Sequence, residues 1–154
     1  MRPRPRPTME PVMLIAIPLL FIPVVLYAIV ILSGVVGTGG VAAAEQALRD
    51  PLFSIPMVSG SAWNVGTGDL ILFLSLILLF FELLKSTSSQ KVAIINHALS
   101  MILFVFCLVA FLLFKGFATS TFFLILTMVM LDVLAGFIVT IISARKDLDF
   151  AGGG

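Results

Sequence analysis

The sequence predicts an all-α membrane protein: a bundle of four transmembrane helices with both termini in the cytoplasm. Hydrophobic residues make up 60% of the 154-residue chain and charged residues only 11%, whereas a soluble domain is about 45–50% apolar and about 25% charged. The apolar residues gather in four runs of spanning length. Lys and Arg lie mostly on one side of these runs. At this length we expect one integral membrane domain, residues 1–154.

A basic, proline-rich arm opens the chain. Proline alternates with arginine through most of residues 1–11, and no helix is expected there because each proline fixes φ and lacks a backbone donor. We interpret the arm as a disordered topology signal. The alternative is an electrostatic contact with anionic lipid headgroups, worth about 1 kcal/mol per arginine near the surface.

The first span is predicted over residues 13–32. Pro18 and Pro23 lie inside it, so we expect a kinked helix whose freed carbonyls bond to neighbours. A cleaved signal peptide is an alternative, with Ala42–Ala44 as the cleavage site. The apolar run is too long for that, and the small residues lie far beyond it. We therefore expect a retained helix.

An ordered extracytoplasmic loop is predicted between the first two spans, over residues 34–68. Its stretch 41–49 is rich in Ala and has the propensity for a short helix. Asp50–Pro51 should end that helix, because the residue before a proline avoids helical backbone angles.

The rest of this loop alternates in polarity. Residues 52–65 alternate around Ser59–Gly60–Ser61, which predicts a short β-hairpin, and Pro56 confines its strand to a sheet edge. We expect Phe53 and Trp63 to anchor the loop at the lipid headgroups. The alternative is a cap over the bundle or a docking surface for another protein.

The remaining spans are predicted over residues 69–85, 92–114 and 120–143. Thr67–Gly68–Asp69 should cap the second span, and Thr119 or Ser120 the fourth. The glycine-ended stretch 147–154 is interpreted as a flexible tail.

Charge placement predicts the topology. Seven basic residues lie on one side of the predicted spans and two on the other: Arg2, Arg4, Arg6, Lys85, Lys91, Arg145 and Lys146 against Arg49 and Lys115. The positive-inside rule therefore places both termini in the cytoplasm. The short basic turns fit a multi-pass protein of a bacterial inner membrane.

Polar residues inside the last three spans fall on shared helix faces. Lipid cannot hydrogen-bond them, so they should meet in the bundle interior. The predicted cluster comprises Ser75, Glu82, Asn96, His97, Ser100, Asp132 and Thr140. Gly136 lies four residues from both Asp132 and Thr140 and should let another helix approach closely.

Asp132 is the costliest member, because it lies near the middle of its span. An unpaired carboxylate there costs about 3 kcal/mol or more. We expect a neutral carboxyl bonded to Ser75, Ser100 or a backbone carbonyl, or one paired with a cation from a partner. The cluster then has two interpretations: interhelical hydrogen bonds alone, or a proton or cation path from Asp132 through Glu82 and His97.

Several function classes are unsupported. Cys107 and His97 are the only cysteine and histidine, so an intramolecular disulfide and a bis-histidine haem within one subunit are excluded. No phosphate loop, metal-ligand spacing or nucleophile–base pair is present. We therefore expect no catalytic residues, metal, cofactor or nucleic acid, and identify no small-molecule substrate and no family.

These observations predict a small non-catalytic integral membrane protein. We expect an accessory or assembly subunit of a larger inner-membrane complex, or a homo-oligomer, whose partners are the lipid bilayer and another membrane protein or a second copy. The alternative is a proton- or cation-coupled carrier or channel that uses Asp132, Glu82 and His97.

Overall fold

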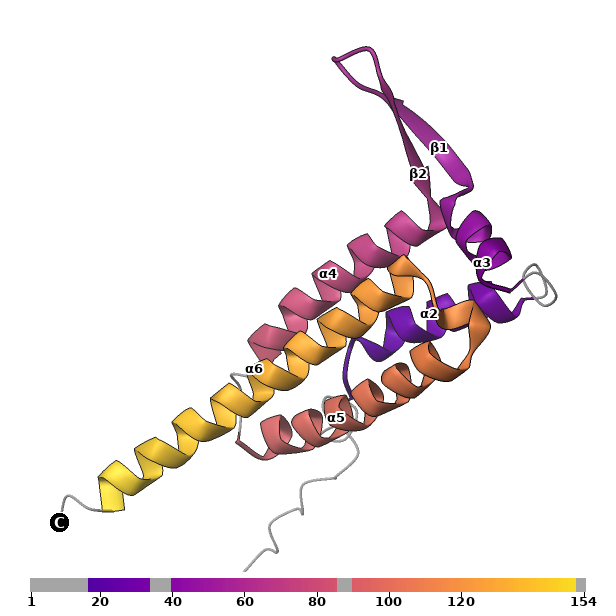
Figure 1. Ribbon diagram of the computed structural model, residues 1–154. Coiled ribbons are helices and arrows are strands. Elements are labelled where there is room, and N and C mark those ends of the chain that lie inside the picture. Colours follow the sequence, from indigo (N-terminus) through magenta and orange to yellow (C-terminus); the bar gives the residue numbers. More distant parts are fainter. Residues whose placement is uncertain (1–16, 34–39, 86–89, 152–154) are drawn as a thin grey trace, which may run out of the picture.

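The computed structural model describes residues 17–33, 40–85 and 90–151, which are mostly helical (Figure 1). The elements in chain order are α2 (Phe21–Leu32), α3 (Gly40–Arg49), β1 (Pro51–Pro56), β2 (Ala62–Gly66), α4 (Thr67–Lys85), α5 (Gln90–Leu113), η1 (Lys115–Phe117) and α6 (Ser120–Ala151). Within the described residues, three helices are long and apolar enough to cross a membrane, namely α4, α5 and α6. The first predicted span, 13–32, contains the shorter apolar helix α2, and residues 13–16 lie outside the described ranges.

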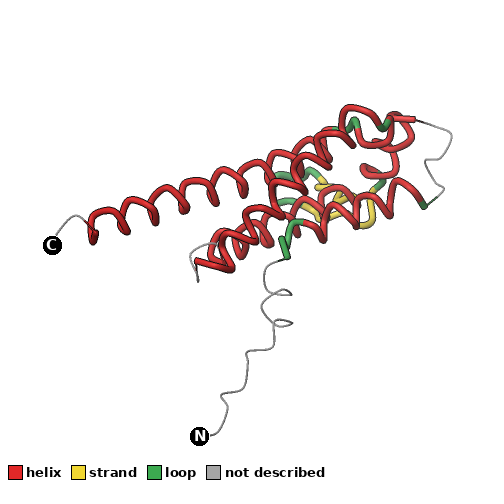
Figure 2. The backbone as a smooth tube through the Cα atoms, turned by 90° about the horizontal axis from the view of Figure 1, so that it is seen from below, coloured by secondary structure: helices red, strands yellow, loops and turns green. Residues whose placement is uncertain are grey.

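Helix α6 is the common packing partner of the long helices. It packs along both α4 and α5, while α2 lies against α4 and α6 (Figures 1 and 2). Tyr27, Phe122, Ile125 and Val129 have no exposed surface and form the centre of the core. Many other large apolar side chains of the helices are exposed, as expected where hydrocarbon replaces water.

The prolines set where α2 begins; they do not kink it. Pro18 lies in a turn before the helix, where its carbonyl accepts a hydrogen bond from Phe21 N at 3.1 Å. Leu20 is the N-cap, so Pro23 falls in the first helical turn, whose N–H groups have no intrahelical acceptor anyway. The kink that the sequence predicts within this segment is therefore absent from α2.

A chain of hydrogen bonds closes the end of the bundle where α5 turns into α6. The Tyr27 hydroxyl donates to Gly116 O at 3.0 Å and also bonds Thr119 Oγ1 at 2.5 Å. Thr119 Oγ1 accepts from Phe122 N at 3.2 Å, which makes it the N-cap of α6. The predicted capping by this threonine is confirmed.

The loop elements pack tightly over the start of α4. Helix α3, close to the predicted bounds, buries Ala44 and Leu48. A Cβ at Gly66 would lie 2.5 Å from Leu48 O, so only glycine fits this approach. Asp69 Oδ2 accepts from Gly66 N at 2.9 Å, which satisfies the backbone donor just before the helix. Thr67, expected in the cap, is the first residue of the helix.

The predicted hairpin is confirmed as an antiparallel β1–β2 pair. It projects from the bundle beside α3, to one side of the α4 axis (Figure 1). All six residues of β1 are exposed. Only the base of β2 is buried, at Val65 and Gly66.

At the other end, α6 continues past the predicted span. The helix reaches Ala151, so residues 147–151, which the sequence analysis places in a flexible tail, are helical. This part of α6 extends beyond the other helices (Figures 1 and 2).

We expect Tyr27→Phe to destabilise the protein by about 1–3 kcal/mol, because it leaves the Gly116 carbonyl and the Thr119 hydroxyl buried without this partner. Unfolding by a denaturing detergent in mixed micelles measures this. Ser33→Ala is the control, since that exposed hydroxyl bonds only Val30 O locally, and it should change stability by less than about 0.5 kcal/mol. Equal effects of the two variants would contradict the assigned role.

Candidate functional site

The predicted polar cluster lies largely inside the bundle. Five of its members have at most 3% of their surface exposed: Ser75, Glu82, Asn96, Ser100 and Asp132. They come from α4, α5 and α6, the three long apolar helices. These five side chains therefore lie in the interior of the helices, on the side away from the exposed apolar residues.

One part of the cluster ties three chain segments together, and we call it the Lys85 network. Lys85 Nζ donates to Ile17 O at 2.7 Å, to Asn96 Oδ1 at 2.8 Å and to Glu82 Oε1 at 3.3 Å. Glu82 Oε2 accepts from Leu19 N at 2.7 Å. The network thus joins the segment before α2 to the end of α4 and the start of α5.

Helix geometry explains why a carboxylate sits here. The backbone N–H groups at the start of a helix have no intrahelical acceptor, and the N-terminal end of the helix dipole favours negative charge. Glu82 supplies an acceptor to Leu19, just before α2. Its own charge is compensated by Lys85, as a fully buried carboxylate requires.

A second part of the cluster lies where α5 faces α6. The Asp132 carboxyl has Ser100 beside it and is within electrostatic reach of Glu82, Lys85 and His97. Among the described residues, three buried side-chain atoms nevertheless have no hydrogen-bond partner: Asp132 Oδ2, Ser100 Oγ and His97 Nδ1. Of the partners expected for Asp132, Ser100 is the neighbouring hydroxyl that acts on the carboxyl. Ser75 is not a partner, since its hydroxyl donates to Ile71 O of its own helix at 2.7 Å.

Gly136 makes room for the histidine. A Cβ at this position would lie 2.6 Å from His97 Nδ1 and 3.1 Å from His97 Cγ. The predicted close approach at Gly136 is therefore made to the His97 side chain on α5. Thr140 is exposed and donates to Gly136 O of its own helix at 2.9 Å, so it does not join the buried cluster.

Phe53 and Trp63 belong to a different region. They lie on the hairpin, with 49% and 51% of their surface exposed. They are separate from the Lys85 network, which lies at the far end of α4.

The role of Lys85 is what sequence reasoning missed. From the sequence, Lys85 is predicted only to be one of the basic residues that determine topology. A signal was present, because Glu82 and Lys85 are three apart and share one face of a helix. The carbonyl of Ile17 had no comparable signal, since its position depends on how α2 packs.

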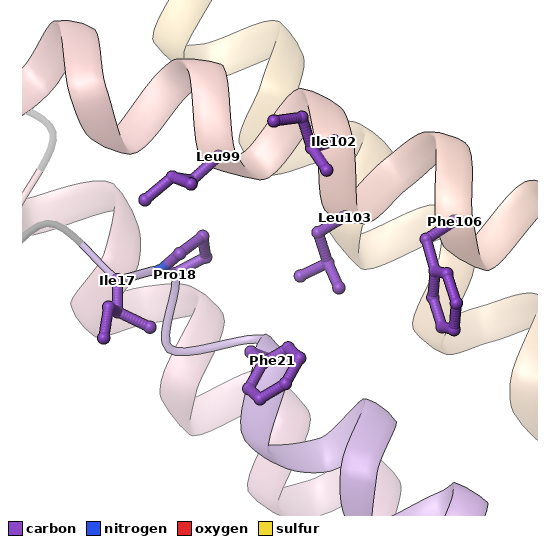
Figure 3. A pocket seen from close by; sticks show the side chains of 7 residues that line it. All are labelled: Ile17, Pro18, Phe21, Leu99, Ile102, Leu103 and Phe106. Carbon is purple, nitrogen blue, oxygen red and sulfur yellow. The ribbon is translucent and has the colours of Figure 1, made fainter.

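An apolar groove of about 440 Å³ lies between the start of α2 and α5 (Figure 3). It is lined by Ile17, Pro18, Phe21, Leu99, Ile102, Leu103 and Phe106. Ile102 and Phe106 are 66% and 60% exposed, which places the groove on the outer surface of the helices. Its lining offers no polar side chain, so the groove offers apolar contacts alone.

The chemistry available in the cluster is proton binding and charge pairing. In the described part of the chain, no three His, Cys, Asp or Glu residues are grouped so as to hold a metal ion. Asp132, Glu82 and His97 can each take up or release a proton. Lys85 supplies a positive charge within reach of both carboxyl groups.

We expect Lys85→Met to destabilise the protein by about 3–5 kcal/mol, because the fully buried Glu82 loses its ionic partner. Unfolding in mixed micelles measures this. Adding Glu82→Gln should recover part of the loss, since the amide can still accept from Leu19 N. Arg49→Met is the control, because the Arg49–Glu45 pair is exposed and should contribute less than about 1 kcal/mol. If the losses of stability from Lys85→Met and Glu82→Gln simply add in the double variant, Lys85 and Glu82 are not an ion pair.

Gly136→Ala should cost about 1–3 kcal/mol of stability by crowding the His97 ring. In a His97→Ala background the same substitution should become neutral or stabilise by up to about 1 kcal/mol, because alanine is the better helix former. Stability curves for the four proteins of this cycle measure the coupling. If Gly136→Ala still destabilises the protein in the His97→Ala background, then His97 is not the residue that requires glycine at position 136.

Comparison with known proteins assigns neither a family nor a function to this chain. No protein-family model, curated protein or solved structure matches this chain.

Proposed function

We propose that this protein is a non-catalytic membrane subunit that helps assemble or stabilise a larger inner-membrane complex. The observation that carries the proposal is the hairpin, which presents an apolar face that the described chain does not cover. In the proposed topology, α2 completes a first span, both termini are cytoplasmic and the hairpin lies on the outer side. The seven-to-two distribution of Lys and Arg supports that orientation.

Strand pairing gives the hairpin two unlike faces. Ile55 lies opposite Trp63 and Phe53 opposite Val65, and directly opposed side chains share a face. This apolar face carries Phe53, Ile55 and Trp63, which are 49%, 37% and 51% exposed. The other face carries Ser54 and Asn64, whose side chains bond each other, and, nearer the turn, Pro56 and Ala62.

Such a hairpin is suited to docking. A two-stranded hairpin in water is marginally stable unless a hydrophobic face packs against something. Within the part of the chain that the structure describes, packing buries only Val65 and Gly66 of the two strands, at the base of the hairpin. Pro51 and Pro56 bracket β1 and limit pairing of a further strand along its edge. The face, and not the edge, is therefore the proposed contact with the extracytoplasmic part of another membrane protein.

We expect the double substitution Ile55→Ser and Trp63→Ser to abolish co-purification with the larger complex in mild detergent, because it removes the centre of the apolar face. Ser54→Ala with Asn64→Ala is the matched control on the opposite face of the same strands. It should leave co-purification unchanged. A protein that is a clean monomer in native membranes, or equal loss with both pairs, would refute the proposal.

Trp63 is the only tryptophan, so its fluorescence reports on the hairpin directly. Emission at short wavelength in the native complex, but not in protein reconstituted into lipid alone, supports a protein partner. Short-wavelength emission in lipid alone would instead show that Trp63 is anchored among headgroups.

A further inference from the structure

Among the described residues, three buried side-chain atoms have no hydrogen-bond partner, and all three lie on the facing helices α5 and α6. Asp132 Oδ2 and Ser100 Oγ belong to side chains that are 3% and 1% exposed, and His97 Nδ1 is buried beside Gly136. Buried polar groups in native proteins are nearly always hydrogen-bonded. Where several lack partners within one site, a species that binds there is the natural explanation.

Charged and titratable groups reach this site from two helices besides α6. Helix α4 contributes Glu82 and Lys85, and α5 contributes His97, all within electrostatic reach of Asp132. The described part of α2, which also packs on α6, carries one titratable side chain, Tyr27. Its hydroxyl is bonded to Thr119 at the opposite end of the bundle. Of the side chains that the structure describes, Glu82, Lys85 and His97 are therefore the charged or titratable ones that act on Asp132.

These surroundings suit a proton better than a metal ion. Hard cations such as Ca²⁺ and Mg²⁺ take six or more oxygen ligands, whereas the unpaired oxygens here are Asp132 Oδ2 and Ser100 Oγ. The Lys85 ammonium within electrostatic reach would repel a second cation. An imidazole with an unpaired ring nitrogen is, in contrast, a common proton carrier.

We propose that Asp132, Ser100 and His97 form an internal proton-binding site that exchanges protons with the cytoplasmic end of the bundle. This activity is separate from the docking role of the hairpin and makes the protein a proton-linked carrier or channel component. Neither Asp132 Oδ2 nor His97 Nδ1 has a hydrogen-bond partner in this structure. When the two atoms come within hydrogen-bond distance, the Asp132 carboxyl loses its proton and the His97 ring takes it up, leaving a carboxylate and an imidazolium. The imidazolium then loses one proton to cytoplasmic water, and the neutral ring is restored.

The placement of His97 supports this order. Gly136, against which Nδ1 packs, lies one helical turn beyond Asp132 toward the end of α6. The neighbouring residue Asn96 bonds Lys85, which also bonds the carbonyl of Ile17. His97 as a whole is only half-buried although Nδ1 is enclosed. The ring therefore lies between the buried carboxyl and the edge of the bundle.

Infrared spectroscopy of the full chain in lipid vesicles tests this site. The parent should show the carbonyl stretch of a protonated carboxylic acid, and this band should respond to pH. Asp132→Asn should remove this band. Asp69→Asn, which replaces an exposed aspartate at the other end of α4, should retain it. A responsive band that survives in Asp132→Asn, or no such band in the parent, overturns the proposal.

A second variant keeps the test decisive if Asp132→Asn does not fold. His97→Gln leaves the Asp132 carboxyl in place, so the band should remain while its response to a rapid pH jump slows by roughly 100-fold. An unchanged rate in a folded His97→Gln protein would exclude His97 as the exchange route and overturn the proposal. The co-purification experiment with the hairpin variants tests the docking role separately. Its outcome does not depend on the infrared results for Asp132→Asn or His97→Gln.

Discussion

The structure depends on one constraint: a carboxylate that is fully buried among apolar helices must have its charge compensated. Glu82 meets this requirement with Lys85 at 3.3 Å and with the backbone N–H of Leu19 at 2.7 Å. Because Lys85 also bonds Ile17 O and Asn96, compensation of one charge also ties the segment before α2 to α4 and α5. Removing either partner would leave an unpaired group where water cannot replace it.

Much of the architecture could be predicted from residue patterns. Apolar length and composition placed the three long helices, and alternation around Gly60 placed the hairpin, because these signals are local. The inward position of Ser75, Glu82, Asn96, Ser100 and Asp132 followed from the cost of polar groups in hydrocarbon. Thr119 was predicted as a cap because its side chain acts on its own helix terminus.

Other features depend on contacts between distant segments, which the sequence does not reveal. The sequence predicts that Pro23 kinks the first span. The turn at Pro18 delays the start of α2, so Pro23 lies in the first helical turn. Thr140 shares a helical spacing with Asp132 and Gly136 but lies at the exposed edge of that face. Lys85 was assigned to the cytoplasmic surface, although its long side chain reaches back to Asn96 and Ile17. Which lysine turns inward depends on which acceptors the folded chain brings near it.

The junction between β2 and α4 has a mechanical consequence. The strand ends at Gly66 and the helix begins at Thr67, so no linker separates them. The carbonyl of Leu48 presses against this junction, and the Asp69 carboxylate holds the backbone N–H of Gly66. The hairpin therefore cannot swivel on its own. The direction of the hairpin is therefore coupled to the direction of the α4 axis, so tilting this helix would turn the hairpin with it as one rigid arm.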